Sequence, residues 1–515
     1  MIRSFLTVSS GTLASRLLGF LRDSMIASLL GTGAAADAFL VAFQFVNVVR
    51  RLLTEGALNA ALVPAWLRLR KTDDALVAAA FAGRVLGTIS MALIAATLLV
   101  GLVMPLIMTA LAPGFAGHPT LALAVNDARL MLPYLAFAGP STVLLALSSA
   151  QGRFVLTACA PLLFNIALIA AMIALMLARA DAAMVAQALA ATVGIAGFLQ
   201  LSILILRRGG EAVAGPLRVS FDTEMRSFFG RAIPGMVASA APQFLMVAGA
   251  IIASSSSSAV SWLYFANRLI ELPLGIVGVA MGTVLIPQLT RAVHGGDSDV
   301  IRHAESRALE LAAGLALPAM LGLMVLNAPV VRLLFEHGAF SPVDTDATSR
   351  ALILLALGLP AQVLVKALSP AFFAREDTLA PLFAALKASI VAIVAAVLLG
   401  HLFGTPGIAA ALALGAWSNA LSLIRRATTT HRLSLDLAAR RRLPSIAAAA
   451  FAMGGLLWLA ATFALPVANG LAQALTLLAL IAGAIAVYAV LLAALGVAGW
   501  RETVAALQQS GNQHT

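Results

Sequence analysis

The sequence predicts an all-α protein that crosses a membrane about fourteen times, with two lobes of about six helices each and two further C-terminal helices. Hydrophobic residues make up 61% of the 515 residues and charged residues only 11%, and the mean hydropathy is +0.99. Soluble domains contain about 45–50% apolar and about 25% charged residues. A chain this apolar can bury its surface only in lipid, which argues against a soluble enzyme.

The individual spans follow from the length of the apolar runs, because a helix needs about 20 mainly apolar residues to cross the hydrocarbon core. The predicted spans lie near residues 6–30, 36–64, 76–110, 127–150, 155–178, 183–206, 227–253, 259–290, 307–331, 347–373, 378–400, 406–424, 443–465 and 470–498.

The basic residues outside these spans predict the orientation. Most Lys and Arg residues fall in alternate loops that share a side with the N-terminus, and the opposite side holds only Arg129, Arg179, Arg332 and Arg350. Loops that carry an excess of Lys and Arg stay in the cytoplasm. We therefore expect both termini in the cytoplasm of a multi-pass protein in the bacterial inner (plasma) membrane. The net charge of +11 fits contact with anionic lipid, and no nucleic-acid partner is expected.

An internal repeat predicts the domain organisation. Pro140 and Pro161 recur at one common offset as Pro360 and Pro381, with a short polar turn between the two prolines in both copies. Two copies of six helices have the same orientation, as in transporters built from parallel repeats. The expected parts are an N-lobe (1–210), a C-lobe (220–430), two added helices (440–500) and a cytoplasmic tail (501–515).

Of the basic residues that fall within predicted spans, four arginines are the main candidates for a site, because a charge at the bilayer centre costs at least about 2.5–3.5 kcal/mol on insertion scales. Arg16 and Arg22 lie in the first span, Arg50 in the second and Arg268 in the eighth. Such residues usually face a cavity or a partner, and the planar guanidinium group suits phosphate through paired hydrogen bonds. These arginines predict a cationic, water-filled cavity for an anionic substrate; the alternative is a set of structural ion pairs.

The ionisable residues beside these arginines are candidates for gating and ion pairing. Asp23 lies seven residues after Arg16 and is expected on the same face of the helix, with Arg22 pointing away. Arg51 and Glu55 are spaced to pair along one helix, and so are Arg268 and Glu271. Asp37 opens the second span, as a helix N-terminal anion or as part of a gate.

No catalytic or metal-binding pattern appears in the sequence. There is no Walker loop, the histidines form no ligand cluster, and Cys159 is the single cysteine. Residues 254–258 are a serine run that is expected to form a flexible periplasmic loop. We expect no catalytic residues, no metal and no firmly indicated cofactor.

Several motifs resemble those of the MurJ (MviN) lipid II flippases, a family of the multidrug/oligosaccharidyl-lipid/polysaccharide exporter superfamily. The resemblance covers nearly the whole chain. It rests on residues 15–23 (SRLLGFLRD), 37–39 (DAF), 47–51 (NVVRR), 55–57 (EGA), 63–64 (VP), 112–115 (APGF), 261–273 (SWLYFANRLIELP), 278–283 (GVAMGT) and Pro287. Asn267 departs from the family pattern, which has aspartate there.

The resemblance implies a non-enzymatic lipid flippase with fourteen helices that works by alternating access. Its substrate would be lipid II, the undecaprenyl-diphosphate-linked peptidoglycan precursor, moved from the cytoplasmic to the periplasmic leaflet. The cavity residues of the family match Arg16, Arg22, Arg50, Arg268, Asp37 and Glu271, and the last two helices would form a groove for the lipid tail. Coupling to a monovalent ion or to the membrane potential, and contact with the cell-wall synthesis machinery, are further expectations.

Three alternatives remain open from the sequence. The nearest is an exporter of drugs or of another polyprenyl-diphosphate-linked glycan in the same superfamily. An enzyme that modifies polyprenyl-phosphate lipids would need carboxylates at the membrane or in long loops, and the loops are short. A scaffold of the cell-wall machinery would tolerate loss of the buried arginines, which a transporter would not.

Overall fold

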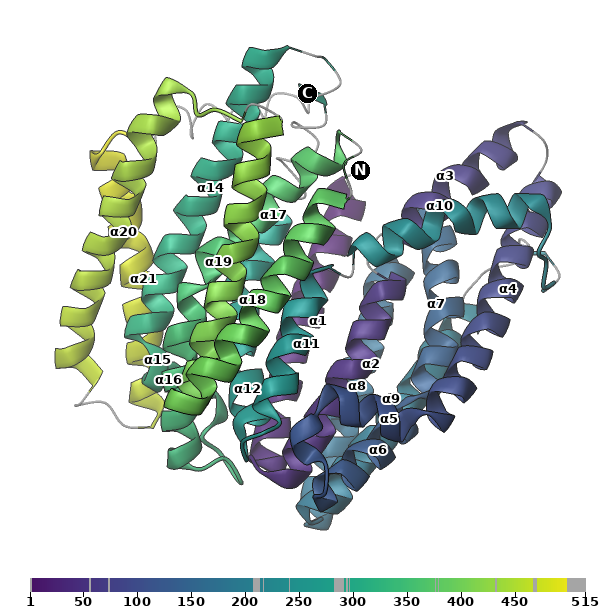
Figure 1. Ribbon diagram of the computed structural model, residues 1–515, viewed down its shortest axis with the longest axis horizontal. Helices are drawn as coiled ribbons and strands as arrows, with labels where there is room; N and C mark the ends of the chain where they lie inside the picture. The colour runs from purple at the N-terminus through teal and green to yellow at the C-terminus, as the bar shows by residue number, and fades with distance from the viewer. Residues whose placement is uncertain are drawn as a thin grey trace. The chain divides into compact units, whose positions relative to one another are not determined.

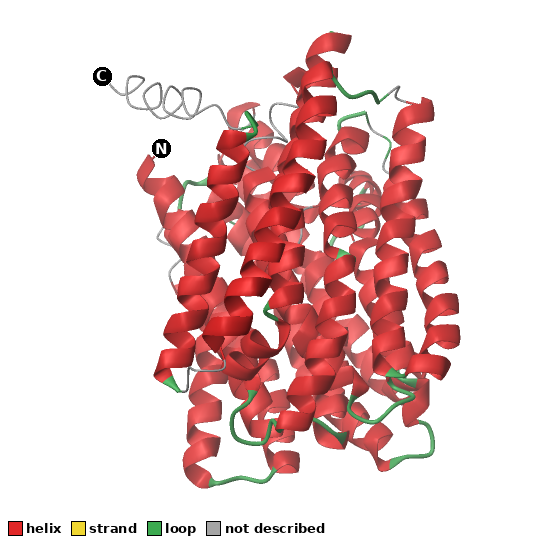
Figure 2. Cartoon of the chain, turned by 90° about the vertical axis from the view of Figure 1, so that its left-hand side faces the viewer, coloured by secondary structure: helices red, strands yellow, loops and turns green. Residues whose placement is uncertain are grey.

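The computed structural model describes residues 2–54, 57–72, 75–206, 214–215, 217–239, 241–281, 291–292, 295, 297–375, 377, 379–430, 433–465 and 470–497. These residues form helices joined by short turns, with no strand among them (Figure 2). The packing divides the chain into two compact units. Unit 1 comprises residues 1–264 and 335–344, and unit 2 comprises residues 265–334 and 345–515.

Unit 1 contains the first helices of the chain (Figure 1). They are α1 (Ile2–Leu30), α2 (Ala34–Thr54), α3 (Ala57–Thr72), α4 (Ala75–Leu102), α5 (Met104–Leu111), the 3-10 helix η1 (Pro113–Phe115), α6 (Pro119–Met131), α7 (Pro133–Ala150), α8 (Phe154–Ala178), α9 (Ala182–Leu206), α10 (Thr223–Ser239) and α11 (Ala241–Ala253). The second predicted span, 36–64, is therefore divided between α2 and α3.

The core of unit 1 is apolar and joins α3, α4, α7 and α10. Trp66, Phe81, Val143 and Phe228 are among its fully buried members. In Figure 1, α3 and α10 lie side by side near one end of the unit. Phe81 and Phe228 meet edge to face, with ring centroids 5.7 Å apart, the geometry that aromatic pairs prefer.

Helix α12 (Ala259–Ala280) begins in unit 1 and continues into unit 2. The other helices of unit 2 are α14 (Ser298–Val325), α15 (Asn327–Phe335), α16 (Pro342–Leu357), α17 (Leu359–Phe373), α18 (Leu379–Phe403), α19 (Thr405–Thr430), α20 (Leu437–Ala464) and α21 (Leu471–Ala494), the first turn of α16 and the last residue of α15 belonging to unit 1. Helices α18 and α19 pack along each other, and α20 packs on α14 and α21.

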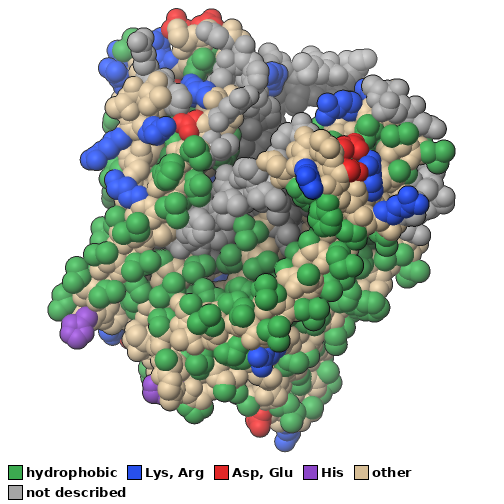
Figure 3. Space-filling model, turned by 45° about the vertical axis from the view of Figure 1, so that its right-hand side comes forward, with side chains coloured by type: hydrophobic (Ala, Val, Ile, Leu, Met, Phe, Trp, Pro, Cys, Tyr) green, Lys and Arg blue, Asp and Glu red, His purple; other side chains and the backbone are tan. Residues whose placement is uncertain are grey.

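Eight of the described helices are long and apolar enough to cross a membrane, and nine if the bent pair α16 and α17 forms one span. The all-α polytopic class is thus confirmed, and the figure of about fourteen spans stays a prediction. Hydrophobic side chains cover most of the face in Figure 3, and Lys and Arg gather toward one edge. Helix α21 is the least covered span, with only 6% of its apolar window buried.

The predicted repeat has a counterpart in the order of elements. In unit 1 the single span Pro119–Ala150, which comprises α6 and α7 with a turn at Leu132, precedes α8 and α9, of 25 residues each. The pair α16–α17, which is bent by 41° at its break, precedes α18 and α19, of 25 and 26 residues. The lobe boundaries at residues 210, 220 and 430 stay a prediction, because the two units group the chain by contact rather than by repeat.

Candidate functional site

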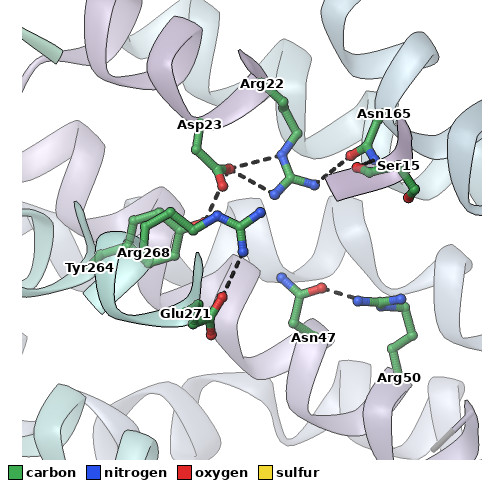
Figure 4. Close-up of polar contacts among 9 residues, drawn as sticks. All are labelled: Ser15, Arg22, Asp23, Asn47, Arg50, Asn165, Tyr264, Arg268 and Glu271. Carbon is green, nitrogen blue, oxygen red and sulfur yellow. Dashed lines mark hydrogen bonds and ion pairs between the residues drawn. The ribbon is translucent and has the colours of Figure 1, made fainter. Parts of the chain in front are cut away.

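Arg22 and Asp23 form a buried ion pair inside α1. Arg22 is 7% exposed and Asp23 is fully buried. The Nε and Nη2 atoms of Arg22 donate to Asp23 Oδ1 at 2.9 and 2.7 Å. The sequence predicted that Arg22 would point away from Asp23, but the long arginine side chain folds back and reaches the adjacent carboxylate (Figure 4). A buried arginine with a charged partner is far less costly than an isolated one.

The third contact of Arg22 was not anticipated. Its Nη1 atom donates to Asn165 Oδ1 in α8 at 2.9 Å, and Asn165 donates to the backbone carbonyl of Ser15 at 3.1 Å (Figure 4). The guanidinium carbon lies 5.2 and 5.7 Å from the ring centroids of Phe43 and Phe164, within cation–π range. An asparagine inside the otherwise apolar run of α8 was the sequence signal that could have marked this site.

The remaining N-terminal arginines differ in burial. Arg50 is half-buried near the end of α2 and donates from Nε to Asn47 Oδ1 at 3.3 Å. Arg51, its neighbour, is also half-buried, whereas Arg16 in α1 is exposed. Glu55 lies outside the described residues, so its pairing with Arg51 stays a prediction. Arg50 thus has a neutral amide among its hydrogen-bond partners.

Arg268 and Glu271 pair one turn apart in α12, as their spacing predicted. The distance from Arg268 Nη1 to Glu271 Oε2 is 2.6 Å, and each side chain is 22% exposed. The pair lies in the part of α12 that belongs to unit 2. Two of the four candidate arginines, Arg22 and Arg268, therefore have a carboxylate partner, so the site is less cationic than the count of arginines alone indicates.

Asp37 caps the start of α12. It lies in the first turn of α2 and is only 2% exposed. Its carboxylate accepts from the backbone nitrogens of Ser258 and Ser261, both at 2.9 Å, and from the Ser261 hydroxyl at 2.5 Å. The first nitrogens of a helix have no intrahelical acceptor and favour an anion. The sequence predicted Asp37 as a helix N-terminal anion, and the structure gives it this role for a second helix.

The serine turn before α12 is held by specific hydrogen bonds, although we expected a flexible loop. Ser254 is 4% exposed, and its hydroxyl accepts from the backbone nitrogen of Gly114 at 3.0 Å. Ser258 has a positive φ of 63°, and its nitrogen donates to Asp37. Polyserine composition alone predicts flexibility, but these long-range partners give the turn a defined conformation.

A second carboxylate, Asp344, joins three segments of unit 1. It accepts from the Thr32 hydroxyl at 2.6 Å, from the Trp262 indole nitrogen at 2.9 Å, and from the Ser341 nitrogen and hydroxyl at 2.9 and 2.7 Å. Thr32 belongs to the turn between α1 and α2, and Trp262 to the first turn of α12. Asp344 therefore ties the start of α12 to that turn.

The segment 335–344, which carries Asp344, packs tightly on the end of α1. The nitrogen of Ala339 donates to the Ser28 carbonyl at 2.7 Å. Gly31 and Gly338 have positive φ values of 60°, and a Cβ at Gly31 would lie 2.5 Å from the carbonyl oxygen of Ala339. Glycine is required there because any other residue would clash with this backbone. Sequence reasoning missed this contact.

An ionic strap joins α4 to residues at and before the start of α10. Arg84 donates to Asp222 Oδ2 at 2.7 Å and to Glu224 Oε2 at 2.6 Å. The pKa of Asp222 lies below its ordinary value, chiefly because the Met225 backbone nitrogen and the Ser220 hydroxyl donate to it, with Arg84 adding to the effect. The strap fixes the segment before α10 against α4.

The described residues contain no group of three or more His, Cys, Asp or Glu that could hold a metal ion. They do contain long apolar helices, the buried ion pair of Arg22 and Asp23, and the buried helix cap at Asp37. Charged residues at membrane depth are typical of substrate and ion pathways. The fold and the site therefore define a polytopic membrane protein of the transporter class.

Comparison with known proteins places the chain within this class. The family model described as "Lipid II flippase MurJ" matches residues 26–497. A probable lipid II flippase MurJ of Rhizobium meliloti (strain 1021) is 36% identical over 95% of this chain and 92% of its own length. The lipid II flippase MurJ of Burkholderia cenocepacia is 31% identical over 82% of this chain and 83% of its own. The chain belongs to the MurJ lipid II flippase family, and it is an integral inner-membrane protein.

Solved structures agree with the fold. The structure titled "Lipid II flippase MurJ, inward closed conformation" has a TM-score of 0.77 with 22% identity, covering 94% of this chain and 98% of that chain. An inward-facing multidrug resistance MATE family transporter of the MOP superfamily has a TM-score of 0.64 with 16% identity, covering 84% of this chain and 95% of that chain.

Proposed function

We propose that this protein translocates lipid II across the inner membrane, from the cytoplasmic to the periplasmic leaflet, by alternating access. The observation that carries the proposal is the family match over residues 26–497, which includes Arg50 in α2 and Arg268 in α12. Arg22 lies earlier, in α1. The cavity is cationic, and these three arginines bind the diphosphate, because guanidinium groups form strong charge-assisted hydrogen bonds with phosphate oxygens.

The ion pairs of these arginines are compatible with this role. Arg22 and Arg268 are held by Asp23 and Glu271, which keep the guanidinium groups oriented. A diphosphate can compete with these partners for the guanidinium donors. Arg50 donates to the neutral amide of Asn47 and is proposed to engage the diphosphate as well. Arg16, Arg51 and Glu55 serve as accessory cavity and gating residues.

The gate lies at the start of α12. Asp37 and Asp344 both hold that helix end, through Ser258, Ser261 and Trp262. Release of these hydrogen bonds accompanies the change to the other access state. With both termini in the cytoplasm, this end of α12 faces the periplasm, so the two carboxylates would act as a gate on that side.

The lipid tail stays in the membrane along α20 and α21. Both helices expose large apolar side chains, including Trp458, Phe463 and Ile485 at 60%, 74% and 65%. Transport by rocking of the lobes requires only that the polar headgroup enter the protein. The energy comes from a monovalent-ion gradient or from the membrane potential, and the cell-wall synthesis machinery receives the product.

The test is translocation of fluorescent lipid II by the full-length protein in proteoliposomes, read as accessibility to an external enzyme. The wild type is expected to expose lipid II, and Arg50→Ala to do so at least about tenfold more slowly, the effect of losing about 1.4 kcal/mol. Arg350→Ala is the matched control, because Arg350 is exposed and pairs along its own helix with Asp346. Equal rates for all three proteins would overturn the role of Arg50, and a wild type without activity would overturn the function.

A second candidate is export of a drug or of another polyprenyl-diphosphate-linked glycan. The TM-score of 0.64 to a multidrug resistance MATE transporter favours it. Depletion of the protein in its host distinguishes the two: loss of periplasmic lipid II with accumulation on the cytoplasmic side supports the flippase. Unchanged accessibility with normal wall synthesis supports the other exporter.

A further inference from the structure

Asp127 is a buried carboxylate to which the proposed transport cycle gives no role. It lies in α6, and its side chain is only 1% exposed. Within the described part of the chain, no group donates a hydrogen bond to its buried Oδ1 atom. Asp23 and Asp37, two other buried carboxylates of unit 1, accept two and three hydrogen bonds at 2.9 Å or less.

The position of Asp127 on α6 directs it into the helix packing. Ala124, Ala128 and Met131 are buried on the same face, at the three- and four-residue spacing of one side of a helix. Asn126 and Arg129, on the opposite faces, are exposed. Asp127 therefore lies on the buried face of α6, where the neighbouring residues are apolar.

Helices α2 and α9 close over this face. Both pack along α6, and a Cβ at Gly194 in α9 would lie 2.5 Å from the carbonyl oxygen of Leu130, one turn beyond Asp127. The buried residues of α9 around this contact include Leu189, Ala190 and Val193. An ionised carboxylate in such a place, to which no described group donates, is strongly disfavoured.

The ionisable groups on the neighbouring helices have contacts elsewhere. Helices α9, α5 and η1 contain no ionisable residue. On α2, Asp37 is bonded to Ser258 and Ser261, and on α6 itself Arg129 donates to the Gly101 carbonyl. The others are Arg50 and Arg51 near the end of α2, Tyr134 in α7, which interacts with Arg50, and His118, which precedes α6.

We propose that Asp127 carries a bound proton in this conformation and releases it when the packing of α6 against α2 and α9 opens. A proton fits better than a metal cation, because a hard cation needs several oxygen ligands and the buried residues of these helices are mainly apolar. The carboxyl group is then a proton-binding site coupled to transport, and the coupling, though not the site, rests on the proposed function.

The coupling follows from where α2 lies. This helix packs along α6, the helix of Asp127, and also carries Asp37, which holds the start of α12. A conformational change that moves α2 breaks the Asp37 contacts and admits water to Asp127. The closed packing binds the proton more tightly, so acid favours it. A change of one pH unit then shifts the ratio of the two conformations by up to about tenfold.

The site is tested by infrared difference titration of the full-length protein in lipid nanodiscs. The wild type is expected to show the carbonyl band of a buried carboxylic acid at neutral pH, and Asp127→Asn to lack it. Asp181→Asn is the matched control, because Asp181 is an exposed residue that accepts from the Met184 nitrogen at the start of α9. A band that persists in Asp127→Asn overturns the proposal. A band that disappears when sodium is added also overturns it, because the site would then bind a metal cation rather than only a proton.

The coupling is tested in proteoliposomes with an imposed pH difference. Lipid II translocation by the wild type and by Asp181→Asn is expected to change with the pH difference, while that of Asp127→Asn does not. If the rate of lipid II translocation by the wild type does not change with the pH difference, the coupling is overturned. If no variant translocates lipid II, the proposed function fails, and the infrared band decides the proton site by itself.

Discussion

Asp37 and Asp127 are two aspartates of the same unit with nearly equal burial, at 2% and 1% exposure, and opposite surroundings. Asp37 accepts three hydrogen bonds from the start of α12, whereas no described group donates to Oδ1 of Asp127. Burial alone therefore does not define the role of a carboxylate in this bundle. The donors around it decide whether it holds a helix end in place or stays available to bind a proton.

The strongest way to test this comparison is to remove the shortest hydrogen bonds to Asp23, a third buried carboxylate of unit 1. Arg22→Ala removes the two bonds to Asp23 Oδ1 at 2.9 and 2.7 Å and leaves the Tyr264 hydroxyl at 3.4 Å beside a fully buried carboxylate. Loss of one partner of a buried pair costs about 3–5 kcal/mol, so we expect a large fall in thermal stability in detergent. The double variant Arg22→Ala/Asp23→Ala should recover much of the stability but not lipid II translocation. A single variant as stable as the wild type would contradict the pairing.

Removing the Asp37 carboxylate, which accepts hydrogen bonds from the start of α12, should have the next largest effect. Asp37→Ala leaves the nitrogens of Ser258 and Ser261 without their acceptor, and loss of such a cap costs about 1–3 kcal/mol. We expect faster hydrogen exchange at residues 258–262 and a shift away from the conformation described. Asp37→Asn keeps one acceptor oxygen, so its exchange rate should lie between those of the wild type and of Asp37→Ala. Unchanged exchange in Asp37→Ala would show that the cap does not hold α12.

Trp262→Phe tests the neighbouring carboxylate with a smaller change. The substitution keeps an aromatic ring but removes the indole donor to Asp344 at 2.9 Å. Asp344 retains Thr32 and Ser341, so we expect a loss of only about 1 kcal/mol in thermal stability. Trp417→Phe is a suitable control, since that indole donates to a backbone carbonyl at an exposed site. Equal losses in the two variants would deny Asp344 a special role.

The ionic strap on α4 should give the smallest effect. Arg84 pairs with exposed Asp222 and Glu224, and exposed pairs are screened by salt. The folded pKa of Asp222 is lowered, so its contribution is present above the ordinary aspartate pKa and is lost as the pH falls through the lowered value. Arg84→Ala is expected to reduce thermal stability slightly at neutral pH and low salt. A difference that persists in acid or in high salt would contradict this origin.

The sequence by itself determined the all-α membrane class, the family and the positions of the candidate arginines. It also determined the pair of Arg268 and Glu271, because residues three apart meet on any helix. Composition and local periodicity can be read from the sequence without knowing which residues meet in the folded protein. For the same reason, hydropathy identified the longest spans, while the ends of the broken spans were less certain.

Only the tertiary structure decided which groups surround each charge. Asn165 reaches Arg22, Asp37 caps α12, and segment 335–344 packs on α1, through contacts between residues far apart in the chain. Asp127 drew no attention in the sequence, because its burial depends on how α2 and α9 cover α6. Long-range contacts of this kind are set by the packing of whole helices, and no local spacing rule contains them.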